Sequence, residues 1–186
     1  MDADTTKAFL DEKFDSTFVP SLKGFIEIDN LTPAFDTEYF TNGKVQEVIE
    51  YVRKFATEME IEGLKFDVLD DGKRAPMVVI TYEGKGAPNV MLYGHLDKQP
   101  HMEGWREGTG PTAPVIIDDK LYGRGSSDDG YVPFASLLAI KNAILQGAEL
   151  PRIAIVLETE EESGSHDLIP LLEDCHQWIK DPDYCI

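Results

Sequence analysis

The spacing of apolar residues along the chain first predicts helices. Between residues 5 and 27 apolar side chains recur at helical intervals, and Pro20 interrupts the series, so we expect a helix with a break or kink there. Residues 29–42 are rich in turn formers and predict a loop. Residues 44–60 predict an amphipathic helix, because their apolar side chains fall on one helical face.

From residue 64 onward the period shortens to that of strands. Short apolar or β-branched runs are separated by turn sequences and by a long Pro- and Gly-rich loop over 98–114. Strands alternating with helices predict an α/β fold, with a mixed β-sheet flanked by helices, formed by residues 1–186 as part of one domain. The expected strands are 64–69, 77–82, 89–93, 115–117, 120–122, 153–158 and 184–186, and the expected helices among them are 130–147 and 167–179.

Composition narrows the class of partner. The 186 residues carry 35 acidic and 17 basic side chains, a net charge of −18, which argues against nucleic acid and against an anionic membrane surface. No run approaches the roughly 20 apolar residues of a membrane span, and no signal peptide is visible. We therefore expect a cytoplasmic protein in which Cys175 and Cys185 form no disulfide.

The first candidate for chemistry follows the apolar run over residues 89–93. His95 and Asp97 are two residues apart, so on a strand they project from the same face. One imidazole nitrogen could then bind a metal while the carboxylate accepts a hydrogen bond from the other. The plainer alternative is a core histidine hydrogen-bonded to a nearby acid.

The second candidate is the pair Asp128 and Asp129, which a helix follows at once. Aspartate is a good helix N-cap, and glycine-rich turns before helices often bind phosphate. Two carboxylates would repel a phosphate, however, so a cation shared by the pair explains the sequence better.

The third candidate is a run of three glutamates, Glu160, Glu161 and Glu162, just after the apolar run 153–158. Acidic groups at the end of a buried strand are costly unless a cation or a proton compensates them. A solvated acidic turn is the alternative. The preceding strand weighs against it, because ligands of open α/β sheets bind at strand ends.

Together the three clusters offer imidazole and carboxylate donors without thiolates. Such donors suit zinc, with cobalt or manganese as alternatives. Two such ions held roughly 3.5–4 Å apart by a bridging carboxylate could activate water for attack on an amide. A glutamate that is not a ligand would take the proton from that water and pass it to the leaving amine.

These motifs resemble those of the dizinc exopeptidase family that includes carnosinases, aminoacylases and bacterial carboxypeptidases. The segments are GHLDKQP at 94–100, LYGRGSSDDG at 121–130 and EESGS at 161–165. They are most similar to the carnosinase and cytosolic nonspecific dipeptidase branch. The order and spacing agree from about residue 44, and the first 43 residues agree more loosely.

The resemblance implies roles for five residues. His95 would bind one zinc ion, and Asp97 would orient its ring. Asp128 would bridge the two ions, with a cis peptide to the next residue. Glu161 would be the general base and Glu162 a ligand of the other zinc ion. In the same way the resemblance implies hydrolysis of dipeptides or short peptides.

The chain also departs from the family pattern. Lys98 replaces an apolar residue after the His-x-Asp motif, and Gly130-Tyr131 replaces the usual Lys-Gly after the paired aspartates. The family's remaining Asp and His ligands, and a lid domain used for substrate capture and homodimer formation, would lie beyond residue 186. We therefore expect a truncated form with little activity alone. An N-acyl amino acid deacylase and a non-catalytic metal-binding remnant are the alternative interpretations.

Overall fold

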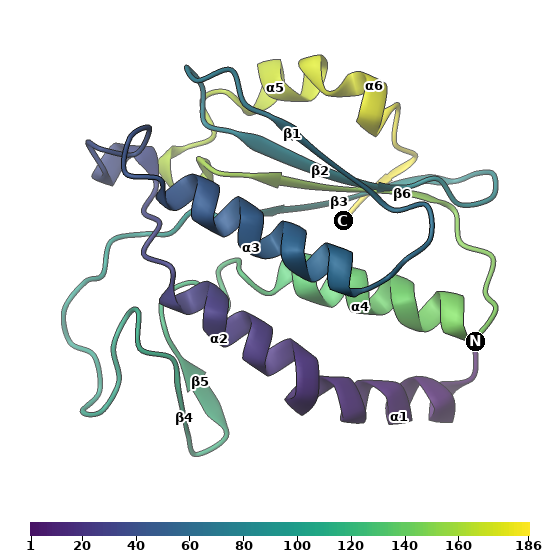
Figure 1. The fold of residues 1–186 in the computed structure, drawn as a ribbon, viewed down its shortest axis with the longest axis horizontal. Coiled ribbons are helices and arrows are strands. Elements are labelled where there is room, and N and C mark those ends of the chain that lie inside the picture. Colours follow the sequence, from purple (N-terminus) through teal and green to yellow (C-terminus); the bar gives the residue numbers. More distant parts are fainter.

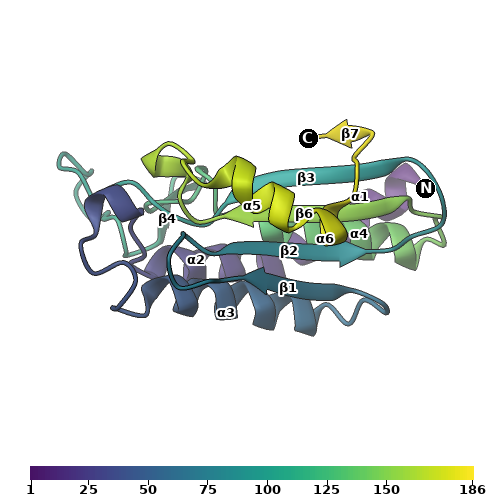
Figure 2. The same cartoon turned by 90° about the horizontal axis from the view of Figure 1, so that it is seen from above.

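A five-stranded mixed sheet organises the chain, and the computed structural model describes it for all residues 1–186 (Figure 1). The strand order is β1-β2-β6-β3-β7, which Figure 2 shows from the side of α5 and α6. Pairing is antiparallel for β1 with β2 and for β2 with β6, and parallel for β3 with both β6 and β7. The strands are β1 Lys65–Leu69, β2 Met77–Tyr82, β3 Asn89–His95, β4 Val115–Ile117, β5 Lys120–Tyr122, β6 Arg152–Glu158 and β7 Tyr184–Cys185. The predicted α/β class with a mixed sheet is confirmed.

Helices cover both faces of this sheet. In Figure 1 α5 and α6 lie on one side of it, and the other four helices lie on the opposite side. The helices are α1 Ala3–Lys13, α2 Val19–Glu27, α3 Lys44–Glu58, α4 Val132–Leu145, α5 Leu168–Asp174 and α6 His176–Ile179. Because both faces are covered, β2 and β6 are apolar along nearly their whole length and do not alternate with polar residues.

Alternate strand residues feed two separate cores. Val78 and Ile80 belong to the larger cluster, which the helices α2, α3 and α4 complete. Met77 and Val79 point to the opposite face and pack with residues of α5 and α6. Phe134 of α4 lies at the centre of the larger core, fully buried, with three other aromatic rings packed edge-on against it.

The expected irregularity in the first helix occurs before the proline. A π-helical turn over Phe14–Phe18 joins α1 to α2, and Pro20 sits in the first turn of α2. Proline is tolerated there because the first amide groups of a helix have no intrahelical acceptor. The prediction of a break at Pro20 was therefore wrong by a few residues. The helix expected over 167–179 is likewise divided, at Cys175.

Two further expectations concern local turns and the membrane. Asp118 and Asp119 both have positive φ angles, 53° and 58°, and form the two-residue turn of the predicted β4–β5 hairpin.

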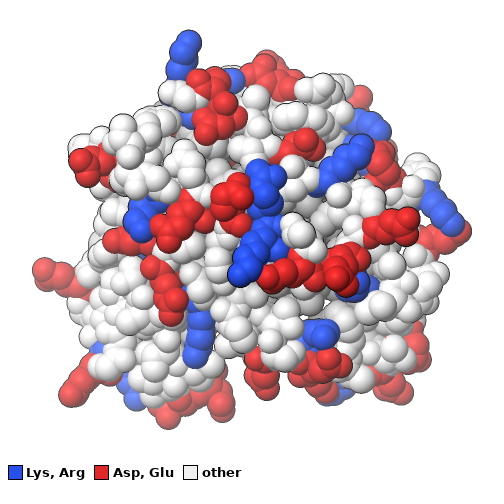
Figure 3. Space-filling view, viewed as in Figure 1, with Lys and Arg blue, Asp and Glu red and all other residues white.

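None of the helices combines the length and hydrophobicity needed to cross a bilayer. Acidic side chains are spread over the face seen in Figure 3, with fewer basic ones between them.

Candidate metal centre

The predicted site residues meet where β3 and β6 end, because these two strands are parallel neighbours. Their register pairs His95 with Glu158, so both strands end at the same level. Asp97 follows β3 by two residues, and a 3-10 turn over Glu161–Ser163 follows β6. The carboxyl ends of parallel strands are the usual place for a ligand in such folds.

His95 is buried and faces oxygen atoms with both ring nitrogens. Its Nε2 lies 2.9 Å from Asp128 Oδ1, and its Nδ1 lies 3.4 Å from Asp97 Oδ1. Burial lowers the pKa of His95, but hydrogen bonds to Asp97 and Asp128 and the negative charges of Asp97 and Asp129 outweigh it and raise that pKa to about 10. The acidic surroundings therefore favour a positive charge at this position.

Asp97 also makes hydrogen bonds that the sequence did not predict. Its side chain is only 1% exposed, and it accepts hydrogen bonds from the backbone amides of Glu161 and Glu162, at 3.2 and 3.0 Å. The same carboxylate thus contacts the imidazole and also binds the 3-10 turn over Glu161–Ser163, which we call the glutamate turn. Asp97 is positioned to set the distance between the two parts of the site.

The glutamate turn brings two more carboxylates to the imidazole. One ligand atom each of His95, Glu161 and Glu162 lies within 4.8 Å of the others. Burial raises the pKa of Glu162, and Gln99 Nε2 donates to its Oε2 at 2.8 Å. Gln99 is a site residue that sequence reasoning missed, although it lies within the first motif.

Asp128 approaches from the loop before α4. The Asp128–Asp129 peptide is cis, as the resemblance implied, and Asp129 Oδ2 accepts a hydrogen bond of 3.2 Å from the His95 backbone amide. This close approach requires a glycine on β3, because a Cβ at Gly94 would lie 2.8 Å both from Asp129 Oδ2 and from a Val132 methyl group.

The donor set fits a divalent cation. The cluster itself consists of the His95 imidazole and the carboxylates of Glu161 and Glu162, and Asp128 lies outside it but contacts His95 Nε2. Imidazole and carboxylate ligands without a thiolate suit zinc, manganese or cobalt. Asp128 and Glu161 have side chains 74% and 41% exposed, whereas His95 and Asp97 are buried. One side of the cluster is therefore open to solvent.

Lys98 anchors this site to the N-terminal helices. Its side chain is buried, and its Nζ donates to the backbone oxygens of Phe25 and Ile28, at 2.7 and 2.6 Å, at the end of α2. The Nζ also lies 4.2 Å from the centre of the Phe25 ring. Burial lowers the pKa of Lys98 to about 7, against the opposing charges of Asp29 and Glu47.

Residues 28–34, which we call the connector, bind both sides of the site. The Thr32 backbone amide donates to the Lys98 carbonyl at 2.9 Å. Thr32 Oγ1 lies 2.5 Å from Ser163 Oγ, and the Ala34 amide donates to the same hydroxyl at 2.9 Å. The connector therefore joins the His-x-Asp loop to the glutamate turn.

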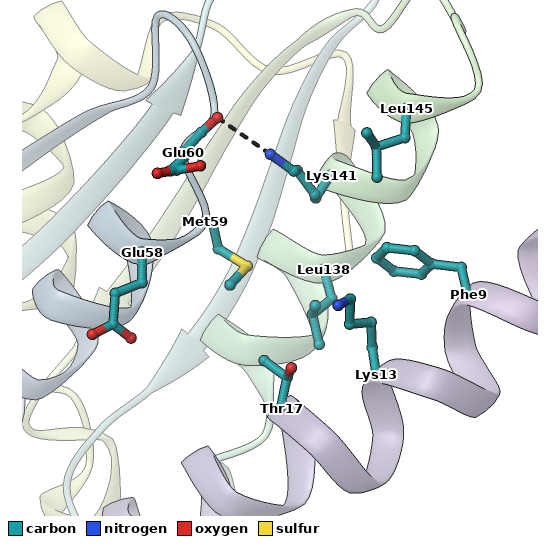
Figure 4. Close-up of a pocket in the computed structure, with 9 residues that line it drawn as sticks. All are labelled: Phe9, Lys13, Thr17, Glu58, Met59, Glu60, Leu138, Lys141 and Leu145. Atoms are coloured by element: carbon teal, nitrogen blue, oxygen red, sulfur yellow. Dashed lines mark hydrogen bonds between the residues drawn. The ribbon is translucent and has the colours of Figure 1, made fainter.

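A cavity of about 240 Å³ lies away from this cluster. It opens between α1, the end of α3 and α4, where Phe9, Met59 and Leu138 form an apolar wall (Figure 4). Lys141 at its rim donates to the Glu60 carbonyl at 3.3 Å. None of its lining residues belongs to the cluster of His95, Glu161 and Glu162.

The three motifs at 94–100, 121–130 and 161–165 all lie in a part of the chain that matches a known protein family. A family model described as Peptidase family M20/M25/M40 matches residues 91–186. Beta-Ala-His dipeptidase of Mus musculus is 31% identical over 157 residues, covering 80% of this chain and 32% of the mouse protein. A succinyl-diaminopimelate desuccinylase of Gluconobacter oxydans is 32% identical over 108 residues, covering 55% of this chain and 27% of that protein.

Solved structures share the fold at lower identity. Human carnosine dipeptidase 1 superimposes with a TM-score of 0.82 at 23% identity, covering 98% of this chain and 40% of the human chain. Dug1p of Saccharomyces cerevisiae superimposes with a TM-score of 0.79 at 21% identity, with the same two coverages. The chain spans about a third of the length of the curated relatives just described.

Proposed function

Because the chain belongs to peptidase family M20/M25/M40, we propose that it carries the larger part of a zinc centre that hydrolyses dipeptides or short peptides. The observation that supports this most directly is the cluster of His95, Glu161 and Glu162 at the ends of β3 and β6, with Asp128 Oδ1 2.9 Å from His95 Nε2. The dipeptidase relatives support the substrate class, and the mouse match is more extensive than the desuccinylase match. The deacylase alternative is therefore not favoured.

In this proposal His95, Asp128 and Glu162 would hold the metal, with Asp128 shared between two ions. Bound zinc supplies a Lewis acid that polarises the scissile carbonyl and lowers the pKa of water. Glu161 Oε2, which lies 3.7 Å from His95 Nε2 and is partly exposed, accepts the proton of the attacking water. The same oxygen then delivers that proton to the leaving amine.

Other residues keep these groups in place. Asp97 holds the imidazole and both glutamate amides, and Gln99 fixes the Glu162 carboxylate through a hydrogen bond to Oε2. Neither side chain needs to contact the substrate for this role. Their contribution is orientation, which governs both metal affinity and the reach of the base.

The number of ligands limits what these 186 residues do alone. One metal would have His95 and Asp128, and the other would have Asp128 and Glu162, whereas a catalytic zinc ion normally has three protein ligands. We therefore propose that a longer protein supplies the missing ligands, together with a lid and a homodimer interface. A cytoplasmic location also belongs to the proposal, supported by two cysteines that form no disulfide.

The test measures zinc binding and dipeptide hydrolysis with the purified chain. We expect weak zinc binding by calorimetry, a higher melting temperature with zinc, and turnover of carnosine or Cys-Gly at background. His95→Ala should abolish the binding. Equal zinc binding by the parent and by His95→Ala would refute the proposed centre, and hydrolysis that Glu161→Gln abolishes would refute the ligand count.

A further inference from the structure

Glu158 is a buried carboxyl group that does not belong to the cluster of His95, Glu161 and Glu162. It is the last residue of β6 and is 2% exposed. Instead of facing a basic side chain, its Oε1 accepts hydrogen bonds from the Tyr93 hydroxyl and, at 2.8 Å, from Ser165 Oγ. A buried carboxyl group is costly unless its hydrogen bonds are made, so this arrangement requires an explanation.

The position of Glu158 explains what these bonds do. The chain leaves β6 at Glu158, forms the turn that carries Glu161 and Glu162, and returns at Ser165. The backbone amide of Ser165 donates to the Glu160 carbonyl at 3.1 Å, and the Glu158 side chain binds the Ser165 hydroxyl. The two ends of the turn are thus fastened together.

The same carboxyl group also reaches the strand of the histidine. Tyr93 lies two residues before His95 on β3, so the two side chains project from the same face of the sheet. Glu158 is the register partner of His95 on β6. Through Tyr93 and Ser165, Glu158 therefore contacts both segments that carry the candidate ligands, whereas Asp97 holds the middle of the turn.

We infer that Glu158 is a positioning residue that fixes the glutamate turn against the histidine strand and thereby sets the affinity for the metal. The inference rests on the proposed function, because it names what holds that centre together. It does not make Glu158 a ligand, since its Oε1 is already engaged by two hydroxyl groups. Hydrogen bonds made directly to metal ligands change metal affinity by about 10- to 100-fold, and Glu158 acts one step further out, through Tyr93 and Ser165.

The experiment compares the zinc affinity of five variants by competition with a chromophoric chelator, after circular dichroism has verified the metal-free fold. Glu158→Ala, Ser165→Ala and Tyr93→Phe should weaken zinc binding by about 10-fold, the lower end of that range. Glu158→Gln should bind within about threefold of the parent, because its amide keeps an oxygen for the Ser165 hydroxyl. Glu160→Gln is the matched control, because it removes a nearby negative charge but leaves the hydrogen bonds of Glu158 with Tyr93 and Ser165 in place.

The outcomes separate this inference from the proposed function. If the parent chain binds no zinc, both are refuted. If the parent binds zinc and both Glu158→Ala and Ser165→Ala bind it equally well, only the inference is refuted. If Glu158→Ala fails to fold, Ser165→Ala and Tyr93→Phe decide, because each removes one hydroxyl group and nothing else.

Discussion

Replacing Lys98 by methionine should remove a pH dependence of stability that this one side chain creates. The ammonium group is buried against the end of α2 with two carbonyl oxygens and a phenyl ring as its partners. Methionine keeps an unbranched stem of similar length and has no charge. The change therefore isolates the charged group with little effect on packing.

The magnitude follows from the pKa of Lys98, which burial lowers from 10.5 to about 7. Between these two values the unfolded chain binds more protons at Lys98 than the folded chain, so the free energy of unfolding rises with pH. At about 1.4 kcal/mol per pH unit for a fully linked proton, and less near pH 7, the gain from pH 7 to pH 9 is about 2 kcal/mol. Lys98→Met lacks this gain.

The assay is urea unfolding of both proteins at pH 7, 8 and 9. All other titrating groups are common to both chains, so the difference between the two free energies of unfolding reports Lys98 alone. Relative to the variant, the parent should become more stable by about 2 kcal/mol across this range. A difference that stays constant, or that moves against the parent as pH rises, would refute the argument that the ammonium group is buried at an energetic cost.

Three other substitutions test the packing and the site. Gly94→Ala places a Cβ 2.8 Å from a Val132 methyl group, and urea unfolding should show a loss of about 1–3 kcal/mol; an unchanged midpoint would contradict the close approach. Phe134→Ala should cost about 3–5 kcal/mol, whereas the control Phe35→Ala, at an exposed position, should cost far less; equal losses would contradict the described core. Asp97→Asn should keep the fold but lower zinc affinity by about 10-fold or more in calorimetry, since an amide nitrogen then replaces one acceptor; unaltered affinity would count against its orienting role.

The strands and the order of elements were predictable because their signal is local. The run Met77–Tyr82 is apolar except for Thr81 and is bounded by turn residues, and its observed limits agree with the sequence expectation. The π-helical turn over Phe14–Phe18 was not predictable in the same way. It changes the hydrogen-bonding pattern while the apolar spacing remains helical. Proline is the usual sequence signal for a helix break, so Pro20 led to a predicted break a few residues too late.

The candidate site was predictable to the extent that its residues follow strand ends. That rule brought His95 and Glu162 into one prediction, whereas Asp128 lies in the loop before α4 and follows no strand of the five-stranded sheet. The metal-binding roles of all three stay predictions. The contacts of Lys98 and Glu158 could not be foreseen, because they depend on which segments become neighbours in space. Lys98 meets a helix end 70 residues earlier, and no local pattern encodes that distance.

The connector explains how the start of the chain can differ from its relatives without losing its place in the structure. Most of its contacts with the site use main-chain atoms on at least one side, as in the bond between the Thr32 amide and the Lys98 carbonyl. Main-chain groups are the same in every amino acid, so substitutions can accumulate there while the attachment survives. Substitutions in the connector are therefore compatible with a superposition that covers 98% of the chain.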